Sequence, residues 1–124
     1  MAKYIFIIED DPLLLKAYKL KFTKRGIDIR TATDGKEALE FLAKEPEKPA
    51  AILLDLMLPQ ISGFEVLESL KTMPGWKKMP IVVLSNLSQE ADFEKAKALG
   101  VREYLVKADV KIDDVVEKML GYLT

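Results

Sequence analysis

Residues 4–12 read YIFIIEDDP, a short apolar run that ends in three acidic residues and a proline. The run is rich in β-branched and aromatic residues, which favour a strand, and its apolar residues do not alternate with polar ones. A strand that is apolar on both faces is typical of a parallel sheet with helices on both sides. The proline suits the first turn of a helix, so this stretch predicts a buried strand that leads directly into a helix.

Four further short apolar segments predict the other strands of this sheet. They are residues 27–32, 51–54, 81–84 and 104–106, and the pattern is weakest in the first of these. The segments between the strands have apolar residues at helical spacing. These residues are Leu14, Ala17, Tyr18 and Phe22; Ala38, Leu39 and Leu42; Phe64, Leu67 and Leu70; and Ile112, Val115, Val116, Met119, Leu120 and Leu123.

A further helix is expected over residues 89–99, where the apolar stripe is thin and the helix should be loosely held. Gly26 and Gly100 stand where helices should end, and Asp34 and Ser88 are candidate N-caps. Residues 44–48 and 72–79 have the composition of loops. Trp76 in the second loop is expected to pack against the core, with contact to a partner as the alternative. Strand and helix alternate five times, which predicts an α/β fold, a three-layer doubly wound sandwich with right-handed crossovers.

The composition limits the kinds of function. The chain has 124 residues, 49% of them apolar, which fits one soluble domain. It contains neither cysteine nor histidine, so disulfide frameworks, zinc ribbons and Ser-His-Asp triads are excluded, and a reducing, cytoplasmic location is expected. With 19 basic and 20 acidic residues and a pI near 5.6, the chain lacks the basic surface that direct nucleic-acid binding needs. No apolar run is long enough for membrane insertion.

Polar residues follow four of the five predicted strands. In an open parallel sheet, ligands bind beyond the carboxyl ends of the strands, where these side chains should meet. Taken singly, each has an ordinary explanation, because an Asp often caps a turn, a Ser often satisfies a backbone amide and a Lys is often solvated. The residues in question are Glu9, Asp10 and Asp11 after the first strand, Asp55 after the third, Ser85 after the fourth and Lys107 after the fifth.

Together these residues favour phosphoryl transfer. Carboxylates gathered at one edge repel one another unless a cation lies among them, and oxygen ligands without His or Cys favour a hard divalent ion, Mg²⁺ first. A metal ion beside Asp55, an ammonium group and a hydroxyl can stabilise the charge on a phosphoryl group while a carboxylate attacks phosphorus.

The motifs of this chain resemble those of the receiver domain of two-component response regulators, of the single-domain, chemotaxis type found in bacteria. The resemblance covers essentially the whole chain, and its most specific element is Asp-x-x-x-Pro-x-x-x-Gly. The matching segments are IIEDDP at 7–12, LDLMLPQISG at 54–63, VLS at 83–85 and GVREYLVK at 100–107. The resemblance implies a five-stranded sheet of order 2-1-3-4-5 with five helices, a flavodoxin-like architecture. It also implies a single receiver domain over residues 1–124 without an effector domain.

The resemblance also implies roles for individual residues. Asp55 would be the phosphoacceptor, and Ser85 and Lys107 would hold phosphate oxygens. Tyr104 would be the aromatic switch whose rotamer follows Ser85, and Asp11 would be a loop or helix-start residue. Glu9, Asp10, Asp55 and the backbone carbonyl of Met57 would form the Mg²⁺ site, with Glu9 acting through water and Mn²⁺ as a possible substitute.

The resemblance implies partners as well. The phosphoryl donor would be a phosphohistidine on a sensor histidine kinase or a histidine phosphotransfer protein, since this chain has no histidine of its own. Phosphorylation would then change the surface of the fourth helix, fifth strand and fifth helix, which a downstream protein would recognise. Such a chain is a phosphoacceptor that promotes its own phosphorylation and slow dephosphorylation, and is not otherwise an enzyme.

Three positions depart from the family pattern. Ala108 follows Lys107 where the family usually has a proline after a cis bond, which leaves the isomer of this bond open. Asn86 replaces the usual small residue, and its effect on access to Asp55 or on Tyr104 stays open. Met57 and Leu87 lie two residues beyond Asp55 and Ser85 and are both apolar, so neither can orient a water molecule, and slow dephosphorylation is expected.

Three other functions are alternatives to that of a phosphorylated receiver domain. An aspartyl-nucleophile phosphatase should have a second Asp two residues after the nucleophile, where this chain has Met57. A flavin carrier should have a loop rich in Gly, Ser or Thr after the first strand, where this chain is acidic. The third is a receiver-like interaction module that is never phosphorylated, and the complete set Asp10, Asp55, Ser85 and Lys107 argues against it.

Overall fold

The five predicted strands form one parallel sheet in the order β2-β1-β3-β4-β5, as the family resemblance implied. A computed structural model of the chain describes residues 4–123. The strand bounds differ from the predicted ones by one residue at most: β2 begins at Asp28, β4 includes Ser85 and β5 begins at Glu103. The strands are β1 (Tyr4–Ile8), β2 (Asp28–Ala32), β3 (Ala51–Leu54), β4 (Ile81–Ser85) and β5 (Glu103–Val106).

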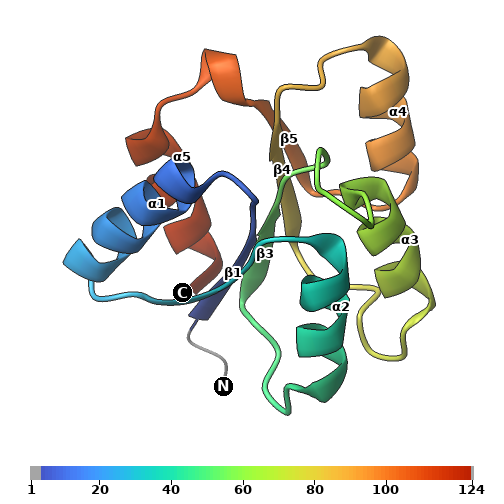
Figure 1. The fold of residues 1–124 in the computed structure, drawn as a ribbon, viewed down its shortest axis with the longest axis horizontal. Coiled ribbons are helices and arrows are strands. Elements are labelled where there is room, and N and C mark those ends of the chain that lie inside the picture. The colour runs from blue at the N-terminus through green and yellow to red at the C-terminus, as the bar shows by residue number, and fades with distance from the viewer. Residues whose placement is uncertain (1–3, 124) are drawn as a thin grey trace.

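Helices cover both faces of the sheet, which gives the three layers that the alternation of elements predicts. Figure 1 shows α1 and α5 on one face of the sheet and α2, α3 and α4 on the other. Two short 3-10 turns follow β5 and α5, at Lys107–Asp109 and Gly121–Leu123. The helices are α1 (Pro12–Lys24), α2 (Gly35–Lys44), α3 (Gly63–Thr72), α4 (Glu90–Ala98) and α5 (Ile112–Leu120).

The apolar side chains of the central strands pack alternately into two cores. In β1, Ile5 and Ile7 face α1 and α5, while Tyr4, Phe6 and Ile8 face the opposite helices. All five residues of β1 are buried, as the continuous apolar run predicts. The sheet is therefore fixed from both sides, and its carboxyl edge is a rigid platform for the polar residues that follow the strands.

The register of the strands sets the positions of those polar residues. Ile8 at the end of β1 pairs with Leu54 at the end of β3, so the residues that follow, Glu9 and Asp55, leave the sheet side by side. The backbone N–H of Asp55 donates a hydrogen bond to the carbonyl of Ile8 at 3.0 Å. This bond continues the ladder one step beyond the strands and holds the two acidic positions together.

Side chains and glycines define the helix ends. Asp11 caps α1 by accepting hydrogen bonds from the N–H groups of Leu13 and Leu14, and Asp34 caps α2 as predicted. Gly26 and Gly100 have positive φ, 71° and 87°, where α1 and α4 were predicted to end.

The prediction that Ser88 caps the fourth helix is wrong. The N-cap of α4 is Gln89, whose N–H donates to the side chain of Asp92 at 3.2 Å. Because an acidic residue in the first turn can satisfy a free backbone N–H, the helix does not need the serine.

The structure also bears on four further points that the sequence raised. Among residues 4–123 no peptide bond is cis, so the bond between Lys107 and Ala108 is trans and continues into the 3-10 turn. Trp76 is buried in the core, as expected. Ala96 is the single buried residue of α4, which agrees with its thin apolar stripe. No helix in the described part of the chain is long and apolar enough to cross a membrane.

Candidate functional site

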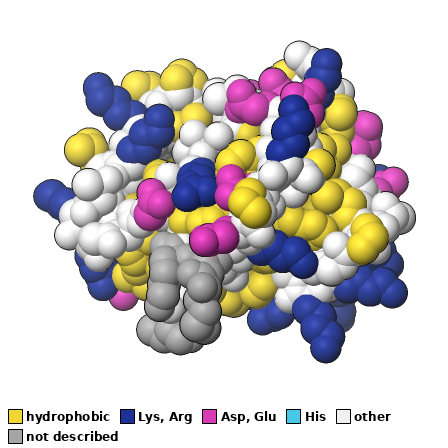
Figure 2. Space-filling model, turned by 90° about the horizontal axis from the view of Figure 1, so that it is seen from below, with side chains coloured by type: hydrophobic (Ala, Val, Ile, Leu, Met, Phe, Trp, Pro, Cys, Tyr) yellow, Lys and Arg dark blue, Asp and Glu magenta, His cyan; other side chains and the backbone are white. Residues whose placement is uncertain are grey.

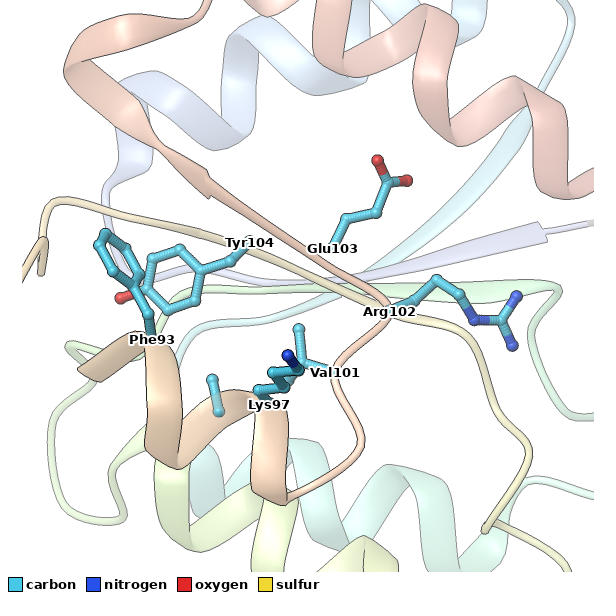
Figure 3. Close-up of a pocket in the computed structure, with 7 residues that line it drawn as sticks. Phe93, Lys97, Val101, Arg102, Glu103 and Tyr104 are labelled. Carbon is cyan, nitrogen blue, oxygen red and sulfur yellow. The ribbon is translucent and has the colours of Figure 1, made fainter. Parts of the chain in front are cut away.

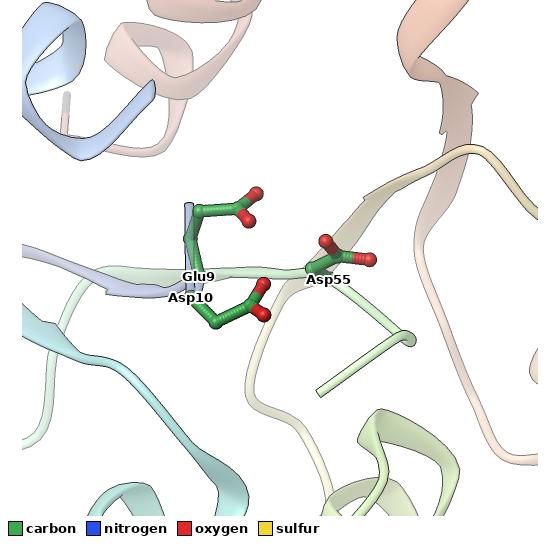
Figure 4. Close-up of side chains that lie close together, drawn as sticks. All are labelled: Glu9, Asp10 and Asp55. Atoms are coloured by element: carbon green, nitrogen blue, oxygen red, sulfur yellow. The ribbon is translucent and has the colours of Figure 1, made fainter. Parts of the chain in front are cut away.

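Three carboxylates meet at the carboxyl edge of the sheet. Glu9 and Asp10 follow β1, Asp55 follows β3, and one oxygen of each lies within 4.8 Å of the others (Figure 4). Glu9 and Asp55 are almost fully buried, whereas Asp10 is exposed. The site therefore has two acidic groups set into the protein and a third that faces solvent, and all its donor atoms are oxygens. A hard divalent cation such as Mg²⁺ prefers this kind of site.

Lys107 at the end of β5 provides the positive charge of the site. Its Nζ lies 2.7 Å from Oδ2 of Asp55 and 2.8 Å from Oε1 of Glu9. The ammonium group thus bridges two buried carboxylates, which offsets part of the cost of burying them. The sequence prediction had placed Lys107 at this edge but had not paired it with Glu9.

The environment shifts the pKa values of Glu9 and Lys107. Burial raises the pKa of Glu9 to about 7; the hydrogen bond from Lys107 opposes this shift, and the negative charge of Asp55 adds to it. Burial alone would lower the pKa of Lys107, but its hydrogen bonds with Asp55 and Glu9 outweigh burial and raise it. Lys107 is therefore charged at neutral pH, while Glu9 is close to its midpoint in the absence of a metal ion.

The loop between β3 and α3 holds the Asp55 side chain in place. The backbone N–H of Met57 donates to Oδ1 of Asp55 at 3.0 Å, so both carboxylate oxygens have a partner. Gly63 lies close to the beginning of the same loop, where its N–H donates to the carbonyl of Leu56. A Cβ at this position would lie 2.5 Å from the carbonyl oxygen of Asp55. Asp55 and Gly63 are the two ends of the Asp-x-x-x-Pro-x-x-x-Gly element, and their close contact explains why the second end is glycine.

Ser85 and Tyr104 are connected through one residue of the loop after β4. The Ser85 side chain is fully buried, and its Oγ accepts a hydrogen bond from the N–H of Leu87 at 3.4 Å. The hydroxyl of Tyr104 donates to the carbonyl of the same Leu87 at 2.7 Å. Sequence reasoning had linked Ser85 to Tyr104 by family resemblance and had not identified this backbone connection, because a main-chain contact leaves no signal in the side-chain pattern.

The remaining predicted residues lie in the segments that follow β1, β3 and β4. The side chain of Met57 is 55% exposed, Asn86 is exposed and Leu87 is half-buried. Asp11 lies beside the cluster, where its N–H donates to Glu9, and its own carboxylate caps α1. Asp11 is thus a helix-start residue, one of the two roles considered for it.

A pocket of about 480 Å³ lies between α4 and β5, next to Tyr104. The Tyr104 ring packs edge-on against Phe93 with 4.7 Å between ring centroids, and Val101 and Lys97 also line the pocket (Figure 3). Tyr104 therefore contacts the loop after β4 with its hydroxyl and this pocket with its ring.

Comparison with known proteins agrees with this geometry. Over 103 residues the chain is 36% identical to the transcriptional regulatory protein KdpE of Mycobacterium tuberculosis, an alignment that covers 83% of this chain and 43% of KdpE. This chain thus spans less than half the length of that relative. The structure superimposes on the phosphorylated cyanobacterial phytochrome response regulator RcpA with a TM-score of 0.83 and 30% identity, covering 98% of this chain and 91% of RcpA.

A second solved structure adds a metal-bound example. It is the Mn²⁺-bound form of response regulator Rcp1, with a TM-score of 0.81 and 31% identity, covering 96% of this chain and 90% of Rcp1. A model of the response regulator receiver domain matches residues 5–119. This range contains every element from β1 to α5 except the first residue of β1 and the last residue of α5. The chain belongs to the response regulator receiver domain family.

Proposed function

We propose that this chain accepts a phosphoryl group on Asp55 in a Mg²⁺-dependent reaction and transmits the change to its α4–β5–α5 surface. One observation carries the proposal: Asp55 is buried within 4.8 Å of two further acidic residues, and its Oδ2 lies 2.7 Å from the ammonium group of Lys107. A carboxylate nucleophile with adjacent positive charge is the arrangement that phosphoryl transfer requires.

The residues present fit a divalent metal ion. Glu9, Asp10 and Asp55 provide carboxylate oxygens from two neighbouring strands, and the solvent-exposed Asp10 leaves room for bound water. Asp10 and Asp55 would hold Mg²⁺, or Mn²⁺ in its place, together with the backbone carbonyl of Met57, and Glu9 would act through water. When bound, the ion supplies positive charge next to the phosphoryl oxygens.

The reaction itself can be written with the groups of this chain. A carboxylate oxygen of Asp55 forms a bond to phosphorus while the P–N bond to an imidazole of the donor breaks, and the departing nitrogen keeps the electron pair and takes up a proton. Lys107 then pairs with a phosphoryl oxygen instead of the carboxylate of Asp55. The donor in this proposal is a phosphohistidine. Because the chain has no histidine of its own, this residue belongs to another protein, a sensor kinase or a phosphotransfer protein.

The output step uses the link through Leu87. If the Ser85 hydroxyl turns toward the phosphoryl group, it no longer accepts from the Leu87 N–H, and the segment that also holds the Tyr104 hydroxyl is free to shift. Movement of Tyr104 changes the pocket between α4 and β5 that a downstream protein would recognise. The phosphorylated form of the similar response regulator RcpA supports the same chemistry.

Intact-mass measurement tests the proposal directly. Wild-type protein is incubated with acetyl phosphate in the presence of Mg²⁺ or of EDTA. With this donor a P–O bond breaks, whereas with phosphohistidine a P–N bond breaks. We expect the mass of one phosphoryl group only with Mg²⁺, no gain in Asp55→Asn, and a normal gain in Asp34→Asn, which changes a carboxylate at the cap of α2. An adduct that persists in Asp55→Asn would assign the phosphoacceptor elsewhere. A chain that neither binds Mg²⁺ nor gains mass would be the unphosphorylated interaction module.

A further inference from the structure

Two adjoining hollows lie at the end of the molecule opposite Asp55, around residues 73–80, which join α3 to β4. One hollow, of about 300 Å³, has an apolar floor that includes Leu67, Trp76 and Leu99. The other, of about 450 Å³, is formed by the loop itself around Met73 and Pro74. The two hollows share lining residues, so together they form a single grooved surface at the amino ends of the strands.

All the charged side chains that line this surface are lysines. Lys71 and Lys77 line both hollows and Lys78 lines the second, and no acidic residue is among the lining residues of either. Viewed from this end of the molecule, Lys and Arg side chains gather beside hydrophobic ones at the lower right of Figure 2, while Asp and Glu side chains lie at the upper right. The right is the side on which α3 and α4 lie in Figure 1.

These lysines lack carboxylate partners within the described chain. None of Lys71, Lys77 and Lys78 forms an ion pair with residues 4–123, although Lys71 donates to the carbonyl of Ala98 at 3.3 Å. By contrast, Arg30 at the same end of the sheet pairs with two carboxylates. The positive charge around the hollows is thus available to a partner.

The shape of the loop is fixed before any partner arrives. Two backbone hydrogen bonds form successive turns in this loop: the N–H of Trp76 donates to the carbonyl of Met73, and the N–H of Met79 donates to the carbonyl of Trp76. The Trp76 ring is 6% exposed, and Nζ of Lys48 lies 5.1 Å from its centroid while donating to the carbonyl of Gly75. A preformed surface of this kind loses little conformational freedom on binding.

The surrounding charges favour a short ligand over an extended one. Glu45 and Glu47 lie in the neighbouring loop after α2, and Asp28 begins β2 at the same end of the sheet. The chain as a whole carries a net charge of −1. A flat anionic membrane or a long nucleic acid would meet these carboxylates, whereas a short acidic peptide can lie within the lysine-lined area.

We propose that the two hollows lined by Lys71, Lys77 and Lys78 dock a short acidic segment of a partner protein, with an apolar side chain seated on the floor beside Trp76. Positive side chains at the rim fit carboxylates, and the apolar floor fits a leucine or a similar residue between them. This surface does not include Asp55 or the pocket beside Tyr104, so it is independent of the proposed phosphorylation.

Fluorescence anisotropy with a labelled peptide of alternating Glu and Leu tests this proposal, and the same peptide with Gln in place of Glu is the reference. We expect the acidic peptide to bind more tightly than the reference, and Lys77→Glu with Lys78→Glu to weaken it by roughly tenfold or more. The matched control is Lys19→Glu with Lys24→Glu, which makes the same change of net charge at exposed positions of α1 and should leave the affinity within about twofold.

Nuclear magnetic resonance then locates the bound peptide. The chain has one tryptophan, so its indole N–H gives a single signal, which should shift on titration with the acidic peptide together with the Gly100 amide. Equal weakening by both charge-reversal pairs, or an unmoved Trp76 signal, would overturn the proposal. So would vesicles containing phosphatidylserine that bind through Lys77 and Lys78 while the peptide does not, because the ligand would then be a membrane.

Discussion

Tyr104 and Ser85 hold opposite sides of the same peptide segment, since the Tyr104 hydroxyl donates to the carbonyl of Leu87 at 2.7 Å and the Ser85 oxygen accepts from the Leu87 N–H at 3.4 Å. The Tyr104 bond is shorter and its donor is partly buried. In this state of the protein, therefore, the loop between β4 and α4 is held mainly from the Tyr104 side. Loss of either bond should loosen the loop without disturbing the sheet.

Replacing Tyr104 with Phe should lower the free energy of unfolding by about 1 kcal/mol, because the Leu87 carbonyl loses a partly buried partner while ring packing against Phe93 is kept. Burial, with smaller contributions from Asp92 and Asp55, raises the pKa of Tyr104 to about 12. The hydroxyl is therefore protonated at both pH 6 and pH 9, and the loss should be equal at the two values in urea unfolding.

Tyr122→Phe is the control for this measurement. The Tyr122 hydroxyl donates to Glu103 at 2.9 Å, and this carboxylate also accepts from Lys118, so it keeps a partner when the hydroxyl is removed. Tyr122→Phe should therefore cost less, within about 0.5 kcal/mol. Hydrogen exchange of the amides at residues 86–89 should become faster in Tyr104→Phe and stay unchanged in Tyr122→Phe. Equal exchange in the two variants would mean that Tyr104 does not hold the loop.

The raised pKa of Glu9 predicts a pH-dependent cost of folding. A carboxyl with a pKa of about 7 in the folded protein and an ordinary value of 4.5 keeps its proton to higher pH when folded. The contribution of Glu9 to stability is therefore most favourable below pH 4.5 and is lost as the pH rises through 7. Glu9→Gln removes this cost. In EDTA, the variant should gain about 1 to 2 kcal/mol over wild type at pH 8, after allowance for solvent screening, and much less at pH 5.

Glu103→Gln provides a control of opposite sign. The hydrogen bond from Lys118 lowers the pKa of Glu103, with burial opposing it, so this carboxylate stabilises the fold above its ordinary pKa and loses that effect in acid. Glu103→Gln should therefore be less stable than wild type at pH 8, with the difference shrinking toward pH 4. A Glu9→Gln variant that loses stability at pH 8 would contradict the effect assigned to burial.

The exposed Met57 side chain predicts a long-lived phosphoryl group, if Asp55 is phosphorylated as proposed. The backbone N–H of Met57 contacts Asp55, but its exposed thioether cannot orient an attacking water as an amide can. Met57→Asn should shorten the lifetime by roughly tenfold, measured as loss of phosphoryl mass after the donor is removed. Met57→Leu is the control and should retain the wild-type lifetime. A wild-type lifetime much shorter than that of Met57→Asn would contradict this role.

The sequence predicted the sheet well because its strongest signal is burial on both faces. The runs at 4–8 and 51–54 are apolar throughout and are buried throughout in the structure. The order of the strands came from family resemblance, since hydrophobic patterning does not encode which strands are neighbours. The cap of α4 was missed because Gln89 and Asp92 satisfy the helix start through a contact that a search for Ser, Thr, Asp or Asn at the first position overlooks.

For the site, chain order was enough to place the acidic residues at one edge but not to pair them. The contact between Lys107 and Glu9 joins residues that are 98 positions apart in the chain, and it depends on the side-chain conformation of a flexible lysine. The positions of strand ends are properties of the backbone that periodicity can predict. The partner of a long side chain depends on packing and charge around it, which a single sequence does not specify.

Gly63 provides a test of how closely the β3–α3 loop must pack against Asp55. A Cβ at Gly63 would lie 2.5 Å from the Asp55 carbonyl oxygen and 2.5 Å from the Leu56 Cα, and both are backbone atoms that cannot rotate away. Gly63→Ala should therefore destabilise the protein by about 2 kcal/mol in urea unfolding and weaken Mg²⁺ binding, because relief of the overlap displaces the backbone that carries Asp55.

Gly121→Ala is the control. Gly121 has helical dihedral angles and open space at its Cβ position, so this change should be neutral or stabilise the protein by up to about 1 kcal/mol, with Mg²⁺ affinity unchanged. If both variants behaved alike, the glycine that ends the Asp-x-x-x-Pro-x-x-x-Gly element would not be required by its contact with the backbone of Asp55 and Leu56.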